Sequence, residues 1–337
     1  MPEQEQVYEP RWKRRFADNQ EARRWNQTSL LLTLPLLAVG CYYYGLAVLR
    51  TAVIAAFAAV VCELIGGRLV LRQRVGDDWN AVVIGVWMAC LLPARMEPRN
   101  TVALYAVVGA VFAVLFVKLP FGGTMNAPFS PAAAGFCFLS VCFPAKVYAF
   151  QPSVLVPPAH SRSLAAMLAQ GRSVLDGGHF IDVLLGRVMG PACACALVTL
   201  AILLAMLLIK ERRSSVLVSL GFLVGVALIA FVFPRVVSAG TPLMTRLSAV
   251  GMELFAGNLL FAAVLMLPDP AIMPRRWFTR FGFGAMAGLF AMLLRLLGHY
   301  EDGVCFAVML ADAFMPLTYR LQAEIKSQKE FRSTLNV

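Results

Sequence analysis

The chain of 337 residues is 59% hydrophobic and 15% charged, with a mean hydropathy of +0.71. Soluble domains have about 45–50% apolar and about 25% charged residues, so the composition excludes an ordinary soluble protein. The net charge of +11 does not indicate a nucleic-acid partner, because the basic residues flank apolar segments and form no separate basic face. The long, continuous apolar runs predict an all-α polytopic membrane protein and not a β-barrel.

Ten apolar segments, each a predicted transmembrane helix, follow one another along the chain. They cover residues 29–48, 51–71, 80–94, 101–119, 127–150, 191–209, 216–233, 249–268, 278–297 and 303–320. The third segment is short and ends at Leu92-Pro93, which predicts a broken or half-length helix. A basic N-terminal arm (1–28) precedes the first segment, and a C-terminal tail (321–337) follows the last.

Basic residues are distributed unequally between the two sets of loops. Twenty of the 30 Lys and Arg residues lie in the N-terminal arm and in the loops on its side of the membrane, and nine lie in the opposite loops. Cytoplasmic loops carry such an excess of positive charge. We therefore expect the chain to lie in the inner or plasma membrane with both termini in the cytoplasm. Membrane lipid is then one of its expected partners.

Two stretches of the first half recur in the second half. Residues 81–99 resemble 256–276, and residues 109–123 resemble 284–298. When the second pair of stretches is aligned, Lys118 falls close to the position of Arg295. Because each half holds five segments, an odd number, the second copy must be inverted. The sequence therefore predicts two inverted five-helix repeats, 29–150 and 191–320, joined by an outer loop, 151–190. Inverted repeats hold a ligand or an ion pathway near the midplane between the halves.

One stretch interrupts the apolar pattern most strongly, FGGTMNAPFSPAAAG at 121–135. Irregular backbone at membrane depth is tolerated where protein or a cavity satisfies its polar groups, so a cofactor or ligand pocket that includes Asn126 is one interpretation. The other is an ordinary loop followed by a helix that starts at Pro131.

Acidic residues inside or beside the segments are the candidates for an ion pathway, because charge in a bilayer is costly. Glu253 and Asp312 are the better candidates. Glu63 is close to Arg68 in the sequence, so we expect it to form a structural ion pair. Asp269 lies between two prolines and is expected to end a helix. The eight cysteines lie in apolar runs without a CxxC pair, which predicts buried thiols and no metal site.

Several motifs together are similar to those of one family. They are DDWNAVVIGVWMACLLP (77–93), FGGTMNAPFSPAAAGF (121–136), DVLLGRVMGP (182–191), LFAGNLLFAAVLMLPDP (254–270) and LLRLLGHYEDGVCFAVMLADAFMPL (293–317). The chain resembles, from about residue 29 to 320, the D subunit of the Rnf ion-translocating electron-transport complex and the related B subunit of the sodium-pumping NADH:quinone oxidoreductase. The resemblance implies ten helices in two inverted halves and an electron-transfer role, with ferredoxin/NAD redox chemistry coupled to Na⁺ or H⁺ translocation.

The resemblance also implies FMN, which such relatives attach through a phosphoester to a threonine of the outer loop after the fifth helix. Here that loop has no threonine, and Ser163 falls near the expected position. Thr241, in SAGTPL of a different outer loop, superficially matches the attachment motif. Ser163, Thr241, loss of covalent attachment, and FMN or riboflavin held noncovalently near Asn126 remain open alternatives.

The leading functional hypothesis is an integral membrane subunit of an Rnf-type complex that relays electrons through flavin and couples them to ion movement. Its expected partners are the A, B, C, E and G subunits of such a complex and a flavin transferase. The chain is not expected to be a complete enzyme alone, because it contains no nicotinamide or ferredoxin motif. The alternatives are a permease for flavin or another small solute, built on the same fold, and a purely structural role in a complex.

Overall fold

The computed structural model describes residues 11–70, 79–96, 101–152, 163–171, 180–209, 213–235, 243–274, 276–298 and 302–316. Every regular element within these ranges is a helix. Four of the described helices are long and apolar enough to cross a membrane, namely Ala47–Arg68, Thr101–Lys118, Ser215–Val232 and Trp277–Leu297. With the shorter apolar helices around them, these helices confirm the prediction of an all-α, multi-pass membrane protein.

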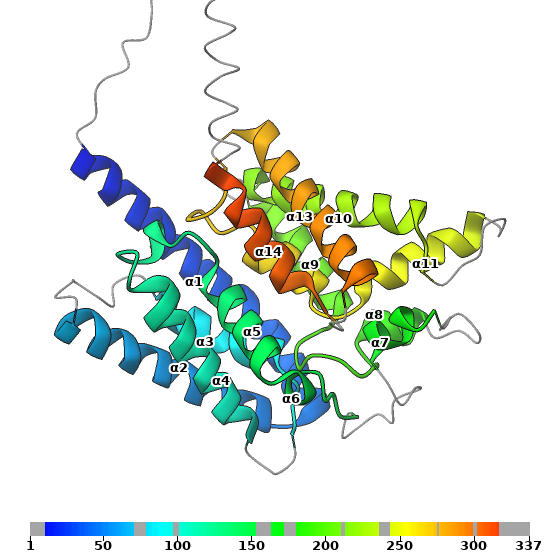
Figure 1. Cartoon of the computed structure of the whole chain (residues 1–337), viewed down its shortest axis with the longest axis horizontal. Coiled ribbons are helices and arrows are strands. Elements are labelled where there is room, and N and C mark those ends of the chain that lie inside the picture. The colour runs from blue at the N-terminus through cyan, green and yellow to red at the C-terminus, as the bar shows by residue number, and fades with distance from the viewer. Residues whose placement is uncertain are drawn as a thin grey trace, which may run out of the picture.

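The first half of the chain forms one bundle (Figure 1). Its elements are α1 (Arg11–Tyr44), α2 (Ala47–Leu64) with the π-helical turn η1 (Ile65–Val70), α3 (Asn80–Leu91), α4 (Thr101–Phe112) with the π-helical turn η2 (Ala113–Lys118), the short 3₁₀ turn η3 (Thr124–Asn126), α5 (Pro131–Cys142) and α6 (Pro144–Val147).

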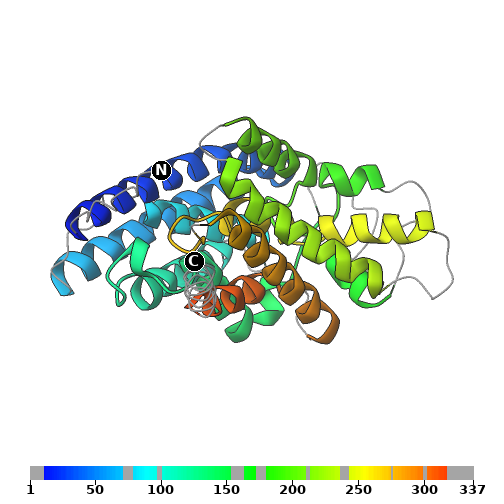
Figure 2. The same cartoon turned by 90° about the horizontal axis from the view of Figure 1, so that it is seen from above.

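The second half forms a bundle beside the first, and Figure 2 shows the two from above. Its elements are α7 (Leu164–Ala169), α8 (Phe180–Leu185), α9 (Ala196–Leu208), α10 (Arg213–Val232), α11 (Leu243–Phe255), α12 (Leu259–Phe261) with the π-helical turn η4 (Ala262–Met266), α13 (Trp277–Leu297) and α14 (Val304–Ala313). Helices α7 and α8 lie in the predicted outer loop and form a small apolar core against α11.

Each of the ten predicted segments contains a helix, but several boundaries differ from the prediction. Helix α1 begins at Arg11 and runs without a break past residue 28, so the basic arm continues the first segment as one 34-residue helix. The segment 127–150 is not one helix, because α5 ends at Cys142 and α6 starts at Pro144. The residue before a proline is disfavoured in the helical conformation, which explains the break at Phe143.

The segment 249–268 is also broken. Helices α11 and α12 meet at a bend of 68° between Phe255 and Leu259. Gly257 stands in the bend with a φ of +64°, in the left-handed region that favours glycine. The third segment is confirmed as a half-length helix, since α3 has only 12 residues and ends where Leu92 adopts an extended conformation before Pro93.

The two short stretches that the sequence comparison pairs, α3 and α12–η4, occupy the interior of the bundles. Nearly all residues of α3 and all residues from Leu259 to Met266 are buried. A helix that is apolar on all sides is surrounded either by lipid or by other parts of the protein, and these two stretches are surrounded by protein. Trp87 of α3 stacks edge-to-face on Phe261 of α12, with 5.9 Å between the ring centroids, so the two halves meet there. The relation of the halves as inverted repeats remains a prediction.

Helices α10 and α13 pack along their length at very short distance. Gly221 and Gly225 of α10 lie against the backbone of α13, and Gly284 and Gly288 of α13 lie against the backbone of α10. A β-carbon at Gly284 would stand 2.0 Å from the carbonyl oxygen of Val218. Small residues four apart on facing helices are the usual means of close helix packing in membranes.

Candidate functional site

The two halves meet along α5 and α14, which pack against one another in opposite directions (Figure 1). At one end the backbone N–H of Ser130, before α5, donates to Asp312 of α14. At the other end the Tyr148 hydroxyl donates to the carbonyl oxygen of Asp302, before α14. With 12 and 10 residues, these helices are about 18 Å and about 15 Å long, too short to cross a hydrocarbon core of about 30 Å.

Asp312 is a buried acidic residue at this interface. Its side chain is 2% exposed. Its Oδ2 atom accepts a hydrogen bond of 2.9 Å from the backbone N–H of Ser130, the residue at the amino end of α5. Its Oδ1 atom is buried and has no hydrogen-bond partner among the residues that the structure describes. A buried carboxylate oxygen without a partner is costly and marks a place where a proton or cation can be held.

Asp269 lies on the same side of the interface, and its charge acts on Asp312. Asp269 is buried, and its Oδ1 atom accepts the N–H of Ala271 at 2.9 Å. Asp269 follows the end of η4 after Leu267 and Pro268, and its side chain holds the turn that comes next, so its expected role in ending a helix remains a prediction. Two carboxyl groups therefore lie near one another at the end of α14.

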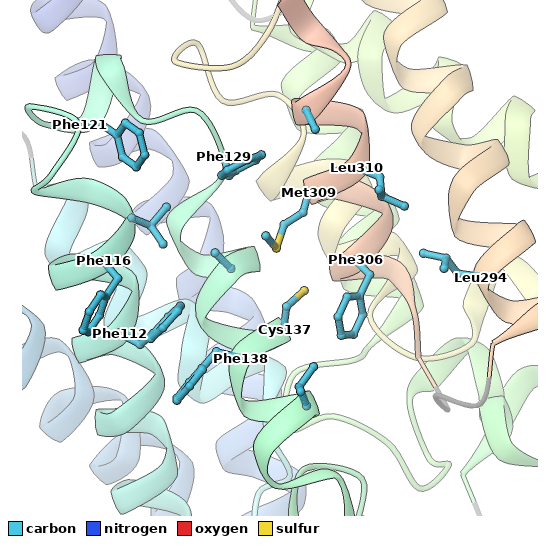
Figure 3. Close-up of a pocket in the computed structure, with 14 residues that line it drawn as sticks. Phe112, Phe116, Phe121, Phe129, Cys137, Phe138, Leu294, Phe306, Met309 and Leu310 are labelled. Atoms are coloured by element: carbon cyan, nitrogen blue, oxygen red, sulfur yellow. The ribbon is translucent and has the colours of Figure 1, made fainter.

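An apolar groove of about 730 Å³ opens beside α5 and α14 (Figure 3). Six phenylalanines from α4, η2, the following loop, α5 and α14 line it: Phe112, Phe116, Phe121, Phe129, Phe138 and Phe306. Its lining contains no charged side chain among the residues that the structure describes. The groove can accept hydrocarbon or an aromatic ring, but it offers few groups that would bind a polar molecule.

Asn126 lies in the loop between Phe121 and Phe129. Its side chain is exposed and donates a hydrogen bond of 3.3 Å to the carbonyl oxygen of Gly122. Gly122 and Gly123 have φ values of +89° and +108°, which explains why glycines occupy this turn. Asn126 is not among the groove-lining residues. Its predicted role in cofactor binding remains a prediction.

A second cluster of charges joins α11, α13 and the ends of α10 and α14. Arg235 donates to both carboxylate oxygens of Glu253, at 2.6 and 2.5 Å. Arg295 lies 3.5 Å from Glu253 and 3.3 Å from Asp302. Two arginines and two carboxylates thus neutralise one another inside the protein. Glu253, the other predicted ion-pathway residue, is held by two cations, whereas Asp312 faces none in the contacts that the structure describes.

Arg295 and Asp302 also hold the break between α11 and α12. The Arg295 guanidinium donates to the carbonyl oxygens of Glu253 and Ala256, at 2.9 and 2.7 Å. Asp302 accepts the N–H of Asn258 at 2.7 Å. These backbone groups stand at the two ends of a broken helix, where a cation stabilises the carboxyl end and an anion the amino end. The sequence signal was Arg295 itself, a basic residue inside an apolar segment.

Glu63 forms the structural ion pair that the sequence predicted, but with a different partner from the nearby Arg68. The ammonium group of Lys118, at the end of η2, lies 2.8 Å from Glu63 on α2. The two side chains are 2% and 6% exposed. Lys118 and Arg295 occupy neighbouring positions when the sequences of the two halves are aligned. Both are buried cations that pair with a glutamate.

The two candidate flavin-attachment residues differ in what the structure describes. Ser163 begins α7, and its hydroxyl oxygen accepts the N–H of Ala166 at 3.1 Å, so it caps the helix. It is 6% exposed. An FMN phosphoester at this buried oxygen would require the cap to open, so the residues around Ser163 do not fit the group as folded. Thr241 lies outside the described residues.

The described residues contain no group of three or more His, Cys, Asp or Glu side chains that could hold a metal ion. All eight cysteines belong to the described residues and are free thiols, five of them buried. The prediction of buried thiols is therefore confirmed for these five.

The fold and the buried charges define a polytopic membrane protein with a helix-to-helix interface between two halves. The sequence profile of the NQR2, RnfD, RnfE family matches residues 14–326, and the chain belongs to that family. It is 27% identical, over 86% of its length, to 89% of the D subunit of the ion-translocating oxidoreductase complex of Actinobacillus pleuropneumoniae serotype 5b. It is also 27% identical, over 88% of each chain, to the D subunit of the Na⁺-translocating ferredoxin:NAD⁺ oxidoreductase complex of Acetobacterium woodii.

Proposed function

We propose that the chain is an integral membrane subunit of an ion-translocating electron-transport complex, in which ferredoxin/NAD redox chemistry is coupled to Na⁺ or H⁺ movement. The observation that carries the proposal is the family match over 14–326, with relatives named as the D subunits of such complexes. The other complex subunits are its partners. Positive loop charge supports an orientation with both termini in the cytoplasm and a place in the inner or plasma membrane.

Within this function, Asp312 is the residue that we place on the ion pathway. It lies where the two halves meet, it is buried, and one of its oxygens, which has no partner among the described residues, can bind a proton or a cation. Asp269 adds a second carboxyl group nearby. Glu253 is a second pathway residue only if a passing ion displaces Arg235, because that arginine holds both of its carboxylate oxygens.

The flavin that the resemblance implies is part of the proposal in a limited form. A flavin in this family supplies one-electron and two-electron chemistry. The described surroundings of Ser163 do not fit an attached FMN, and the groove lacks polar anchors for the hydroxyl groups of riboflavin. Thr241 is the remaining candidate for covalent attachment, and Asn126, in the loop between Phe121 and Phe129, is the candidate polar contact for noncovalent flavin. The same lack of polar lining gives no support to a solute permease.

The proposal is tested by purifying the chain with an affinity tag from its native membranes in mild detergent. Mass spectrometry of the eluate should identify the remaining subunits of a ferredoxin- or NAD-linked complex at comparable amounts. Isolation of the chain without redox partners would contradict the proposal. The same sample is then denatured, run on a gel and inspected for flavin fluorescence, beside a family member with covalently attached flavin as the control. Fluorescence of the band shows whether flavin is attached covalently. The mass shift of one peptide shows whether it is attached at Thr241 or Ser163.

A further inference from the structure

Two buried thiols from different halves of the chain face one another near the end of α3. Cys90 is on α3, and Cys193 is in the segment before α9. The two side chains lie close enough for the thiol of Cys90 to act on that of Cys193. Cys90 is 1% exposed and Cys193 is 2% exposed. More than 100 residues separate them in the sequence, so only the folded arrangement of the halves brings them together.

The backbone around Cys193 is fixed against the first half. The N–H of Ala192 donates to the carbonyl oxygen of Leu92 at 3.0 Å, just after the end of α3. A β-carbon on Gly40 of α1 would stand 2.8 Å from the carbonyl oxygen of Ala192 and 3.2 Å from the sulfur of Cys193. The segment therefore fits between α1 and α3, and the position of Cys193 relative to Cys90 is set by backbone contacts.

We propose that Cys90 and Cys193 form a disulfide that joins the two halves of the chain. This inference rests on the orientation given under the proposed function, which puts the end of α3 and the start of α9 on the outer side of the membrane. Proteins on that side of a bacterial membrane encounter thiol oxidants, whereas the cytoplasm keeps thiols reduced.

The bond forms by thiol–disulfide exchange with a disulfide-carrying oxidoreductase on the outer side. One cysteine thiolate attacks the oxidant's disulfide and releases one of its thiols, and the second cysteine thiolate then attacks the mixed disulfide and releases the other. The two cysteines lose two electrons and two protons, and the oxidant becomes a dithiol. Exchange occurs during folding, before the segment closes between α1 and α3, because both thiols are inaccessible afterwards.

A covalent link here has a structural consequence. It closes a long loop that contains α4 to α8, and cross-links over long loops restrict the unfolded chain most strongly. The same bond also attaches the segment that precedes α9 to helix α3, which is one of the two buried half-length stretches.

The test uses the tagged full chain in its native complex. Cells are quenched in acid, the protein is denatured without reductant, free thiols are alkylated, and peptides are analysed by mass spectrometry before and after reduction. We expect a linked peptide pair containing Cys90 and Cys193 that is lost on reduction, while exposed Cys142 is alkylated in full. Cys137 and Cys305, buried on α5 and α14 and close enough to influence one another, are the matched pair and should stay free.

A Cys90→Ser variant should make Cys193 fully alkylatable, and a Cys137→Ser variant should leave the linked peptide unchanged. A reporter fused to the C-terminus records the orientation in the same cells. If the reporter is cytoplasmic and Cys90 and Cys193 are both alkylated, the disulfide is wrong and the orientation stands. If the reporter is outside and both thiols are free, the orientation and the disulfide are both wrong.

Discussion

Arg295 shows how one residue can support a broken helix inside a membrane protein. Its guanidinium contacts Glu253 and Asp302 and two carbonyl oxygens at the bend between α11 and α12. The sequence shows this residue inside an apolar segment, where a charge is costly and is usually paired. It could not identify Glu253 as a partner, because Glu253 lies on α11, which only the tertiary fold brings near.

Replacing Arg295 with methionine should destabilise the protein strongly. The change removes the cation that the described residues give Asp302 and the Arg295 donor to the Ala256 carbonyl, and breaking a buried ion pair costs about 3–5 kcal/mol. Arg187, whose side chain is 44% exposed and 3.5 Å from Asp182, is the control, because such surface pairs contribute at most about 1 kcal/mol. Thermal unfolding of the detergent-purified variants, followed by tryptophan fluorescence, compares them. Equal midpoints for Arg295→Met and Arg187→Met would contradict this role of Arg295.

At the scale of elements, hydropathy predicted where helices occur but not how they end. Ten apolar segments were expected, and each contains a helix. The two segments predicted as single helices and found broken, 127–150 and 249–268, contain a proline at 144 and a glycine at 257. An apolar run of spanning length conceals such breaks, because burial in other helices can satisfy the backbone that a break exposes.

The glycines of α10 and α13 show a second feature that composition does not reveal. Gly282 and Gly284 are two residues apart on α13, yet only Gly284 faces α10. A β-carbon on Gly284 would meet the Val218 carbonyl at 2.0 Å, whereas one on Gly282 meets nothing within 4 Å. The sequence spacing GxxxG is consistent with a helix contact, but the partner helix follows only from the fold.

Gly284→Ala should therefore separate α10 and α13, at a cost of about 1–3 kcal/mol typical of overpacking. Gly282→Ala, on the same helix, should be neutral or slightly stabilising, because alanine is the better helix former. The yield of monodisperse protein in size-exclusion chromatography and the thermal midpoint measure the difference. A Gly284→Ala protein as stable as Gly282→Ala would show that the close α10–α13 contact does not form.

On the scale of the whole molecule, the two halves meet at a pair of helices that are too short to cross the membrane. The sequence predicted two halves, and the acidic residues Asp312 and Glu253 inside apolar segments were candidates for the ion pathway. The structure separates these two residues by their surroundings, since Glu253 is bound by Arg235 and Asp312 keeps an oxygen without a partner in the described chain. The apolar groove could not be predicted, because its phenylalanines come from separate stretches of sequence that only the fold brings together.

Redox-driven ion uptake tests the central claim most directly. Closed membrane vesicles would contain the complex with the wild-type chain, with Asp312→Asn, or with Asp182→Asn, a partly exposed carboxylate of the predicted outer loop. Electron transfer and the uptake of Na⁺ and H⁺ would be recorded together, at equal amounts of assembled complex. We predict that Asp312→Asn lowers ion uptake per electron by at least about tenfold, which corresponds to about 1.4 kcal/mol, and that Asp182→Asn does not. Undiminished uptake by Asp312→Asn vesicles would contradict an ion pathway at the junction of the two halves.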